Sequence, residues 1–346
     1  MITLDNVTNY KLILTKECNM NCVYCIQNGK NRTIHDDPNK NPLSPQKLAN
    51  LFPNDKPYHI TFFGGEPLLN FDYMIEFVEA LNKFNKQVEY SVVTNGSLMT
   101  LDKVKKINDL NIRVTISHDG VCYKETRSSK DILEDKGNII SKIRKLGFIV
   151  CMTSKNWNFY DNWDYFERFR LKYYIQRPTV CFIAARDLIG NIDDSLFIYK
   201  NKEFETMLKS VFSKLKYDIV SHNYESYEYK AFRRVLEKMY YEGILNHGIT
   251  TCLSMGEALN IDICGNIYVC HNRLDIIAGN ISDLYNVEKQ KFQIADRCIN
   301  CPTKQFCPKC PRVLENKRKY YCYFQKCILG GLINMLLELQ KENVML

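Results

Sequence analysis

The sequence predicts an α/β protein in which a partial (β/α)6 TIM barrel precedes a cysteine-rich C-terminal module. Short β-rich runs alternate with helical segments over the first half of the chain, reactive residues follow the strands, and cysteines crowd the last quarter. A chain of 346 residues with 45% hydrophobic residues has room for one large domain or two linked ones. We expect a barrel at residues 1–185, a helical connector at 186–250, and the cysteine-rich module with a C-terminal helix at 251–346.

Six β-rich runs divide the barrel region: Tyr10–Thr15, Tyr58–Phe63, Val88–Thr94, Ile112–Ser117, Phe148–Thr153 and Thr179–Ile183. Between them, Phe71–Phe84 carries apolar residues at helical spacing, which predicts a helix with one buried face. Repeated β-α units produce parallel strands with right-handed crossovers, and six of them suit a partial barrel. In the connector, Lys202–Leu215 and Tyr227–Tyr241 are also predicted helices.

Motifs rich in cysteine, glycine or polar residues follow four of the predicted strands. In chain order they are Cys18-x3-Cys22-x2-Cys25, Gly64-Gly65-Glu66-Pro67, Thr94-Asn95-Gly96 and Ser117-His118-Asp119-Gly120. The carboxyl ends of parallel barrel strands open on one face, where barrel enzymes place their chemistry. We therefore expect the four motifs to form one site.

Cys18, Cys22 and Cys25 form a C-x3-C-x2-C pattern. Thiolates suit iron–sulfur clusters, and three of them hold three irons of a [4Fe-4S] cubane while the fourth iron lacks a protein ligand. A zinc knuckle, the structural alternative, usually has C-x2-C and a second ligand pair. With Tyr24 before the last cysteine, the run resembles the signature of the radical S-adenosylmethionine (radical SAM) enzymes, in which the open iron binds the methionine part of SAM.

This resemblance implies a reaction. The reduced cluster passes one electron into SAM, which cleaves to methionine and a 5′-deoxyadenosyl radical, and the radical takes a hydrogen atom from an unactivated C–H bond. We therefore expect a radical SAM oxidoreductase that works in an anaerobic setting and draws electrons from an external donor of the flavodoxin or ferredoxin type.

The motif after the second strand also matches the family. There Glu66 supplies an acceptor for the SAM ammonium, while Gly64 and Gly65 let the backbone approach closely. Tyr24 is expected near the adenine by analogy, or else packs behind the cluster.

Three further residues are expected near SAM, each with an alternative. Ser117 matches the serine of the family's Ser-x-Asp-Gly segment, which contacts the ribose or methionine part, and Asp119 either shares that contact or caps the turn. Arg127 either pairs with the SAM carboxylate or is an exposed loop arginine. Asn95 either contacts the cofactor or serves the turn.

The C-terminal cysteines resemble the SPASM domain of radical SAM enzymes that modify peptides and proteins, which carries two auxiliary [4Fe-4S] clusters. They are Cys252, Cys264, Cys270, Cys298, Cys301, Cys307, Cys310, Cys322 and Cys327. One departure is that two residues, not three, separate Cys307 from Cys310. Two C-x2-C pairs also fit a zinc ribbon, but prolines after three of these cysteines and the barrel motif favour iron–sulfur clusters.

The resemblance also assigns ligands. The nearer cluster takes Cys252, Cys270 and Cys310, and the outer cluster takes Cys298, Cys301, Cys307 and Cys327. Cys322 either replaces Cys327, completes the nearer cluster, or does neither, in which case the nearer cluster keeps an open iron. Cys264 is expected at the turn of a hairpin, because a strand of six residues at about 3.3 Å each separates it from Cys270 by about 20 Å.

Two residues are candidates for a catalytic part. His271 stands where anaerobic sulfatase-maturating enzymes have a basic Asp, which argues against that activity; it is expected to act in acid/base chemistry or to support the cluster. Cys122 follows the fourth strand, whereas Cys151 and Cys181 are expected to pack as small hydrophobes.

Composition limits the classes of partner and the cellular location that we expect. A net charge of +8 with scattered basic residues does not indicate nucleic-acid binding. No run reaches the roughly 18 apolar residues of a membrane span, and the chain opens without a signal-peptide pattern. Fifteen cysteines are then best explained by metal thiolates in a reducing cytoplasm.

Two function classes follow. The first is modification of a ribosomally made peptide or protein side chain, by thioether or carbon–carbon cross-linking, epimerisation or oxidation. The second is a radical reaction on a small molecule. With the first strand near Tyr10, we expect no winged-helix leader-recognition domain before the barrel.

Overall fold

The computed structural model describes residues 7–27, 41–54, 56–84, 87–241, 258–286, 296–304, 306–307, 310 and 312–344. The chain forms two compact units, each built from separate segments. The first unit comprises Met1–Ser117, Lys130–Leu146 and Thr250–Phe292, and the second comprises His118–Ser129, Gly147–Ile249 and Gln293–Leu346.

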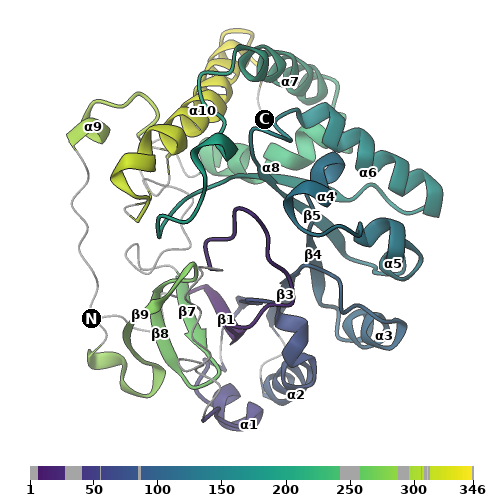
Figure 1. The fold of residues 1–346 in the computed structure, drawn as a ribbon, viewed down its shortest axis with the longest axis vertical. Coiled ribbons are helices and arrows are strands. Elements are labelled where there is room, and N and C mark those ends of the chain that lie inside the picture. The colour runs from purple at the N-terminus through teal and green to yellow at the C-terminus, as the bar shows by residue number, and fades with distance from the viewer. Residues whose placement is uncertain are drawn as a thin grey trace. The chain divides into compact units, whose positions relative to one another are not determined.

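The first unit is built on a mixed sheet, shown in Figure 1. Its strands are β1 (Asn9–Thr15), β2 (Tyr58–Gly64), β3 (Val88–Thr94), β4 (Arg113–Ser117), β7 (Ala258–Asp262), β8 (Asn266–Cys270) and β9 (Arg273–Asn280). Their order is β4-β3-β2-β1-β7-β8-β9. Strands β1 to β4 and β7 are parallel, while β8 and β9 add an antiparallel meander. The carboxyl ends of β1 to β4 therefore lie along one edge.

Helices pack on the apolar face of this sheet. They are α1 (Pro45–Ala49), α2 (Phe71–Asn82), α3 (Leu101–Asp109) and α5 (Ile132–Ile140). Phe77 of α2 contacts Phe62 of β2 edge to face, with ring centroids 6.1 Å apart. Ser44, Thr100 and Asp131 accept backbone hydrogen bonds as the N-caps of α1, α3 and α5. The N-caps and the apolar spacing of the sequence therefore indicate the same helices.

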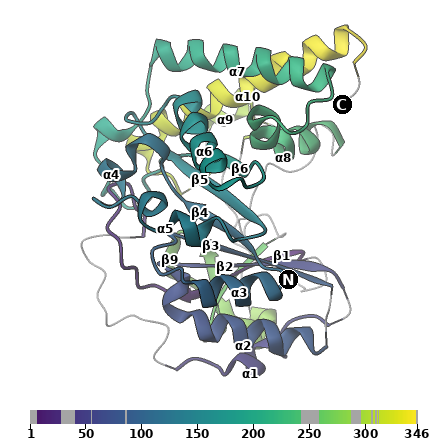
Figure 2. The ribbon, with the colours of Figure 1, turned by 90° about the vertical axis from the view of Figure 1, so that its right-hand side faces the viewer.

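The second unit combines two parallel strands with a group of helices, best seen in Figure 2. These elements are β5 (Leu146–Met152), β6 (Thr179–Ala184), α4 (Tyr123–Thr126), α6 (Phe159–Tyr173), α7 (Lys202–Val220), α8 (Tyr227–Tyr241), α9 (Asp296–Ile299) and α10 (Arg318–Lys341). Helix α10 lies alongside α7, where Lys216 pairs with Glu338 and Glu342. Short 3-10 turns (η4, Pro67–Asn70; η5, Gly120–Cys122; η6, Asp194–Leu196; η8, Ile281–Asn286; η9, Glu315–Lys317) complete the described elements.

The predicted elements are confirmed. The third strand and the helix Tyr227–Tyr241 have the bounds that the sequence predicts, and the other five strands differ by one or two residues at their ends. The hairpin around Cys264 is present between β7 and β8. The three-domain division stays a prediction.

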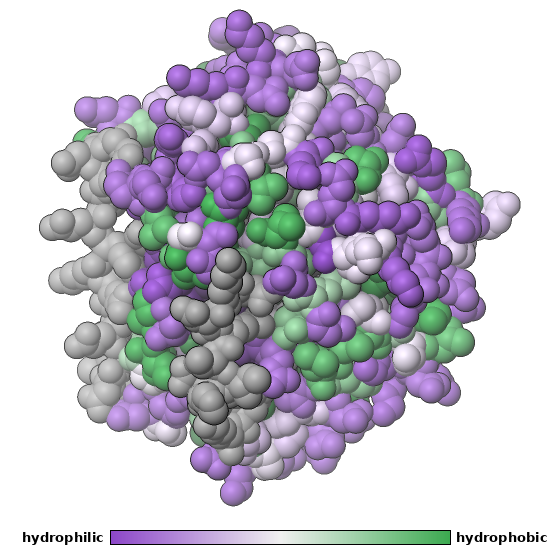
Figure 3. Space-filling view, viewed as in Figure 1, coloured by the Kyte–Doolittle hydropathy of each residue, from purple (hydrophilic) through white to green (hydrophobic). Residues whose placement is uncertain are grey.

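Hydrophilic residues cover much of the face in Figure 3, with hydrophobic ones in patches between them. Among the helices of the described ranges, none has the length and apolar character needed to cross a membrane.

Candidate active site

The turn after β2 packs directly against the chain that leads into the cysteine loop. The amide of Gly65 donates to the Thr15 carbonyl at 2.9 Å, and the amide of Glu66 donates to the Glu17 carbonyl at 2.8 Å. A Cβ at residue 65 would lie 2.0 Å from the Glu17 carbonyl oxygen, and one at Gly64, whose φ is +139°, would lie 2.2 Å from that of Thr15. Only glycine fits at either position, so this turn fixes where the cysteine loop begins.

Glu66 joins this turn to the end of β3. Its side chain is fully buried, and its carboxylate accepts hydrogen bonds from the Thr94 hydroxyl at 2.6 Å, the Asn95 amide at 2.7 Å and the Leu68 amide at 3.0 Å. Burial raises the pKa of Glu66 even though these donors oppose the shift. The carboxylate therefore orders two adjacent strand ends.

Asn95 extends this network to the cysteine loop. Its side-chain amide nitrogen donates to the side-chain oxygen of Asn19 at 2.8 Å and lies 4.0 Å from the Cys18 sulfur. Its own carbonyl oxygen accepts from the amide and hydroxyl of Ser97 at 2.9 and 2.6 Å. Asn19 in turn donates to the Ser97 hydroxyl at 2.8 Å. Asn95 thus holds both the turn and the start of the loop.

Cys18, Cys22 and Cys25 lie on this loop with partly exposed side chains, and none of the three is in a disulfide. The Cys25 amide donates to the Cys22 carbonyl at 3.0 Å, which closes a turn, and Tyr24 is buried beside them. Three thiols on one anchored loop suit a cubane bound through three irons. No group of His, Cys, Asp or Glu in the described ranges is arranged to hold a metal ion, and the ligand roles stay predictions.

His271 lies near the same loop in the first unit. Gln27, two residues after Cys25, donates its side-chain amide to the His271 carbonyl at 2.9 Å. The His271 ring meets the Phe63 ring edge to face at 5.1 Å. The loop is therefore tied to the segment that follows Cys270. Ser117, at the end of β4, is partly exposed.

Arg127, a predicted site residue, belongs to the second unit. Its side chain is 8% exposed, and its Nε donates to the Asp119 carboxylate at 3.2 Å. That carboxylate also accepts from the Thr126 hydroxyl at 2.7 Å and the Cys151 amide at 3.1 Å. The alternative of an exposed loop arginine is therefore wrong, and the SAM-carboxylate role stays a prediction.

Cys122 is partly buried, and its thiol donates to the Lys155 carbonyl at 3.1 Å. Burial, followed by the charges of Glu125 and Asp119, raises the pKa of the Cys122 thiol. A thiol held protonated in this way is a poor nucleophile.

Four C-terminal cysteines line one cavity of about 360 Å³ in the second unit. They are Cys298, Cys301, Cys307 and Cys322. Four lysines and two tyrosines share the lining: Lys200, Lys304, Lys319, Lys326, Tyr199 and Tyr323. The volume falls within the range of about 300–1,000 Å³ typical of small-molecule and cofactor sites. Thiolates and surrounding cations fit an anionic iron–sulfur cluster in both chemistry and charge.

A buried hydroxyl on the helix that carries Cys322 lacks a partner among the described residues. It belongs to Tyr321, which is 4% exposed. Burial raises the pKa of Tyr321, Arg186 opposes the shift, and Cys307, Cys310 and Cys322 add to it. A buried hydroxyl without an acceptor costs about 1–3 kcal/mol, and a cluster sulfur or thiolate would provide one.

The remaining predicted ligands are placed as follows. Cys310 and Cys327 are partly exposed free cysteines outside the lining of that cavity, and Cys270 ends β8 in the first unit. Cys264 lies in the β7–β8 turn, where its amide donates to the Asp262 carboxylate at 2.8 Å. Cys252 lies outside the described residues.

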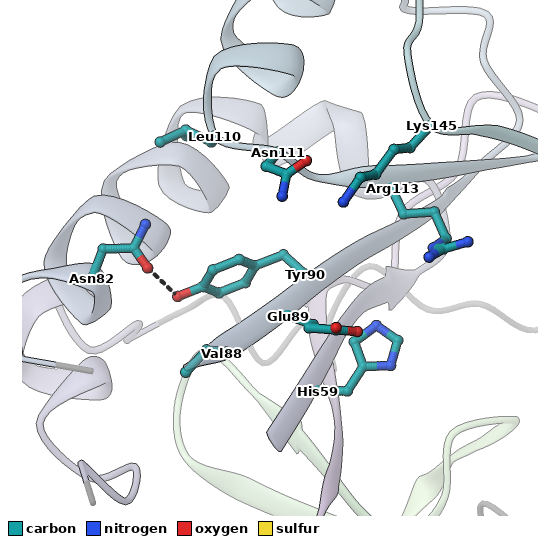
Figure 4. Close-up of a pocket in the computed structure, with 9 residues that line it drawn as sticks. All are labelled: His59, Asn82, Val88, Glu89, Tyr90, Leu110, Asn111, Arg113 and Lys145. Atoms are coloured by element: carbon teal, nitrogen blue, oxygen red, sulfur yellow. Dashed lines mark hydrogen bonds between the residues drawn. The ribbon is translucent and has the colours of Figure 1, made fainter. Parts of the chain in front are cut away.

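A second cavity of about 360 Å³ lies at the opposite ends of the strands in the first unit (Figure 4). His59, Glu89 and Arg113 line it from the starts of β2, β3 and β4. The Tyr90 hydroxyl donates to Asn82 at 2.8 Å within it. Five residues of β2 separate it from Gly64, about 17 Å along the strand, and none of the predicted site residues lines it.

Comparison with known proteins decides the family. The model of the radical SAM superfamily matches residues 12–170. An uncharacterized protein from Methanocaldococcus jannaschii is 30% identical over 304 residues, which cover 84% of this chain and 94% of that protein. The chain belongs to the radical SAM superfamily.

Two further likenesses extend over nearly the whole radical SAM chain. The radical SAM cyclopropyl synthase TigE from Paramaledivibacter caminithermalis is 25% identical over 379 residues, covering 98% of this chain and 76% of TigE. The structure of anSMEcpe, an anaerobic sulfatase-maturating enzyme, with bound AdoMet matches with a TM-score of 0.70 at 18% identity, over 96% of this chain and 99% of that one. It has also been solved with a Kp18Cys peptide. This likeness establishes the fold, a radical SAM partial barrel with a cysteine-rich C-terminal region.

Three residues that order the site were not predicted from the sequence. Asn19, Ser97 and Gln27 support the cysteine loop and its neighbours through hydrogen bonds. Their only signal in the sequence was closeness to the motifs, because these contacts join segments 78 and 244 residues apart.

Proposed function

We propose that this chain is a radical SAM enzyme that modifies a ribosomally made peptide or protein side chain, in a reducing and anaerobic cytoplasm. Cys18, Cys22 and Cys25 would hold the [4Fe-4S] cluster that binds SAM, and the C-terminal cysteines would hold two auxiliary clusters. When bound, the reduced cluster and SAM supply one electron and a hydrogen-atom acceptor strong enough for an unactivated C–H bond. The bond formed is proposed to be a thioether or carbon–carbon cross-link, unless the outcome is epimerisation or oxidation.

The observation that carries this proposal is the anchored cysteine loop. Gly65 and Glu66 hold the backbone at Thr15 and Glu17, and the Asn95 side chain lies 4.0 Å from the Cys18 sulfur, so protein contacts alone hold the start of the loop. Pre-positioned ligands lower the cost of ordering a metal site. The same loop leaves three thiols partly exposed, as binding a cluster with an open iron requires.

Individual cofactor contacts follow from the same edge of the sheet. We propose that Gly64, Gly65 and Glu66 border the SAM methionine part and that Ser117 borders the ribose or methionine part. Asn95 would act through the loop instead of touching SAM, since its side-chain groups are occupied by Asn19 and Ser97. Tyr24, buried beside Cys25, is placed to pack against the cluster or the adenine.

The peptide substrate is supported by the whole-chain likeness to an enzyme solved with a peptide and by the cysteine-lined cavity of the second unit, which suits an auxiliary cluster. His271 remains the proposed acid/base or cluster-supporting group, because its backbone is tied to the loop through Gln27. Electrons are proposed to come from an external flavodoxin- or ferredoxin-type donor.

The test is anaerobic reconstitution with iron, sulfide, SAM and dithionite, with and without short peptides encoded beside the gene. We expect 5′-deoxyadenosine in every assay and a mass change in one peptide only. A variant with Cys18, Cys22 and Cys25 changed to Ala is the control and should give neither product. Deoxyadenosine without change in any peptide would favour a small-molecule substrate, and its absence from fully reconstituted protein would overturn the proposal.

A further inference from the structure

We propose that Cys322, and not Cys327, is the fourth protein ligand of the outer auxiliary cluster. The inference rests on the proposed function, in that it assumes a cluster at Cys298, Cys301 and Cys307. The spacing along the chain does not decide between Cys322 and Cys327 as the fourth ligand, because both follow the last C-x2-C pair within a single helix.

The cavity itself distinguishes the two cysteines. Its lining includes Cys322 together with Cys298, Cys301 and Cys307, whereas Cys327 does not contribute. A cubane bound to four cysteines places each thiolate on a different iron, so its ligands must surround a common space. Only Cys322 shares that space with the other three.

Helix geometry explains this selection. Five residues of α10 line the cavity, namely Lys319, Cys322, Tyr323, Gln325 and Lys326. At about 100° per residue they lie on one side of the helix, with Cys322 near the middle of that side and Cys327 outside it. Cys327 comes five residues after Cys322, which turns its side chain about 140° around the helix axis.

The surroundings of Cys327 are those of a packed thiol. It shares a hydrogen bond with Tyr323, whose hydroxyl lies 2.8 Å from the Glu205 carboxylate of α7 and 3.1 Å from the Asn201 carbonyl oxygen. Ligation of a cluster by Cys327 would break its bond to Tyr323.

Charge and hydrogen bonding support the same set. A [4Fe-4S]2+ core with four thiolates carries two net negative charges, and four lysines line this cavity. The buried hydroxyl of Tyr321, next to Cys322 in sequence, has no partner among the described residues, and a sulfur of the cluster would give it an acceptor. Both features favour a cluster that is bound by four thiolates at this cavity.

The experiment compares Cys322→Ala with its matched control Cys327→Ala, each as the full chain reconstituted anaerobically. Wild type should bind about twelve irons in three cubanes. We expect Cys322→Ala to lose about one third of the iron and sulfide and one of the reduced-cluster EPR signals, and Cys327→Ala to lose neither. Cys322→Ser, which keeps an oxygen ligand, should retain the iron but shift that EPR signal.

Circular dichroism of both variants separates ligand loss from misfolding. Loss of one third of the iron in Cys327→Ala, or full iron and an unchanged EPR spectrum in all Cys322 variants, would overturn the assignment. Wild type that binds only about four irons would overturn it together with the auxiliary clusters of the proposed function. Full iron loading without deoxyadenosine would defeat the proposed reaction and leave this ligand assignment standing.

Discussion

Replacing Gly65 with Ala should displace the cysteine loop and destabilise the first unit. The added Cβ would lie 2.0 Å from the Glu17 carbonyl oxygen, 2.5 Å from its carbonyl carbon and 2.7 Å from the Lys16 oxygen. Real Cβ contacts below 3.0 Å are essentially never seen. All three atoms are backbone, so a rotamer change cannot relieve the clash.

The loss in free energy of unfolding can be estimated from the contacts that the added Cβ forces apart. Moving the turn away breaks the Gly65–Thr15 and Glu66–Glu17 hydrogen bonds, each worth about 0.5–1.5 kcal/mol. Residual overpacking adds about 1–3 kcal/mol. The sum is about 2–6 kcal/mol, or a fall of the order of 10 °C in Tm for a domain of this size.

The assay is thermal unfolding of the apoprotein, followed by iron binding after reconstitution. Gly330→Ala is the matched control, because a Cβ there meets nothing within 4 Å, and alanine in a helix should stabilise by about 0.5–1 kcal/mol. We expect Gly65→Ala to unfold earlier and to bind less iron, and Gly330→Ala to do neither. Equal Tm and iron content in the two variants would refute the reasoning.

Three further predictions follow. Tyr321→Phe should lower the reduction potential of one auxiliary cluster by tens of millivolts in EPR-monitored titration, because a hydrogen bond to sulfur favours the more negative reduced state; an unchanged potential would exclude that bond. Asp119→Ala should reduce the free energy of unfolding in urea by about 3–5 kcal/mol, because it removes the buried carboxylate that accepts from Arg127 Nε, the Thr126 hydroxyl and the Cys151 amide; a loss below about 1 kcal/mol would contradict this pairing. Glu167 has its pKa lowered to about 2, chiefly by its hydrogen bond from Arg170, so its carboxylate contributes stability above about pH 4.5 that is lost as pH falls toward 2. The Tm difference between wild type and Glu167→Gln should therefore be present at pH 7 and disappear near pH 2, and a difference independent of pH would argue against the ion pair.

The strands and main helices were predictable because their periodicity is local. Val88–Thr94 alternates buried and exposed positions at its start, and Phe71–Asn82 keeps an apolar stripe. The local pattern of each segment therefore predicts its secondary structure. The cysteine loop and the glycine turn were predictable as motifs because their spacing along the chain is specific.

Contacts between distant segments were not predictable in this way. The reason for glycine at residue 65 proved to be the backbone of Glu17, which lies 48 residues earlier. Glu66 was expected to face SAM, yet three of its hydrogen bonds are made within the protein. Arg127 was weighed as an exposed residue because the sequence does not reveal that Asp119 turns back to meet it. Cys322 and Cys327 were indistinguishable until the helix face toward the cavity was known.

The central claim is that three cysteines leave one iron of a cluster open to SAM. The most direct measurement is the EPR spectrum of the dithionite-reduced protein, recorded with and without SAM, in wild type and in the variant with Cys18, Cys22 and Cys25 changed to Ala. We expect SAM to shift one cluster signal in wild type and this signal to be missing from the variant. A wild-type spectrum that is indifferent to SAM, or a SAM-dependent shift that persists without the three thiols, would contradict it.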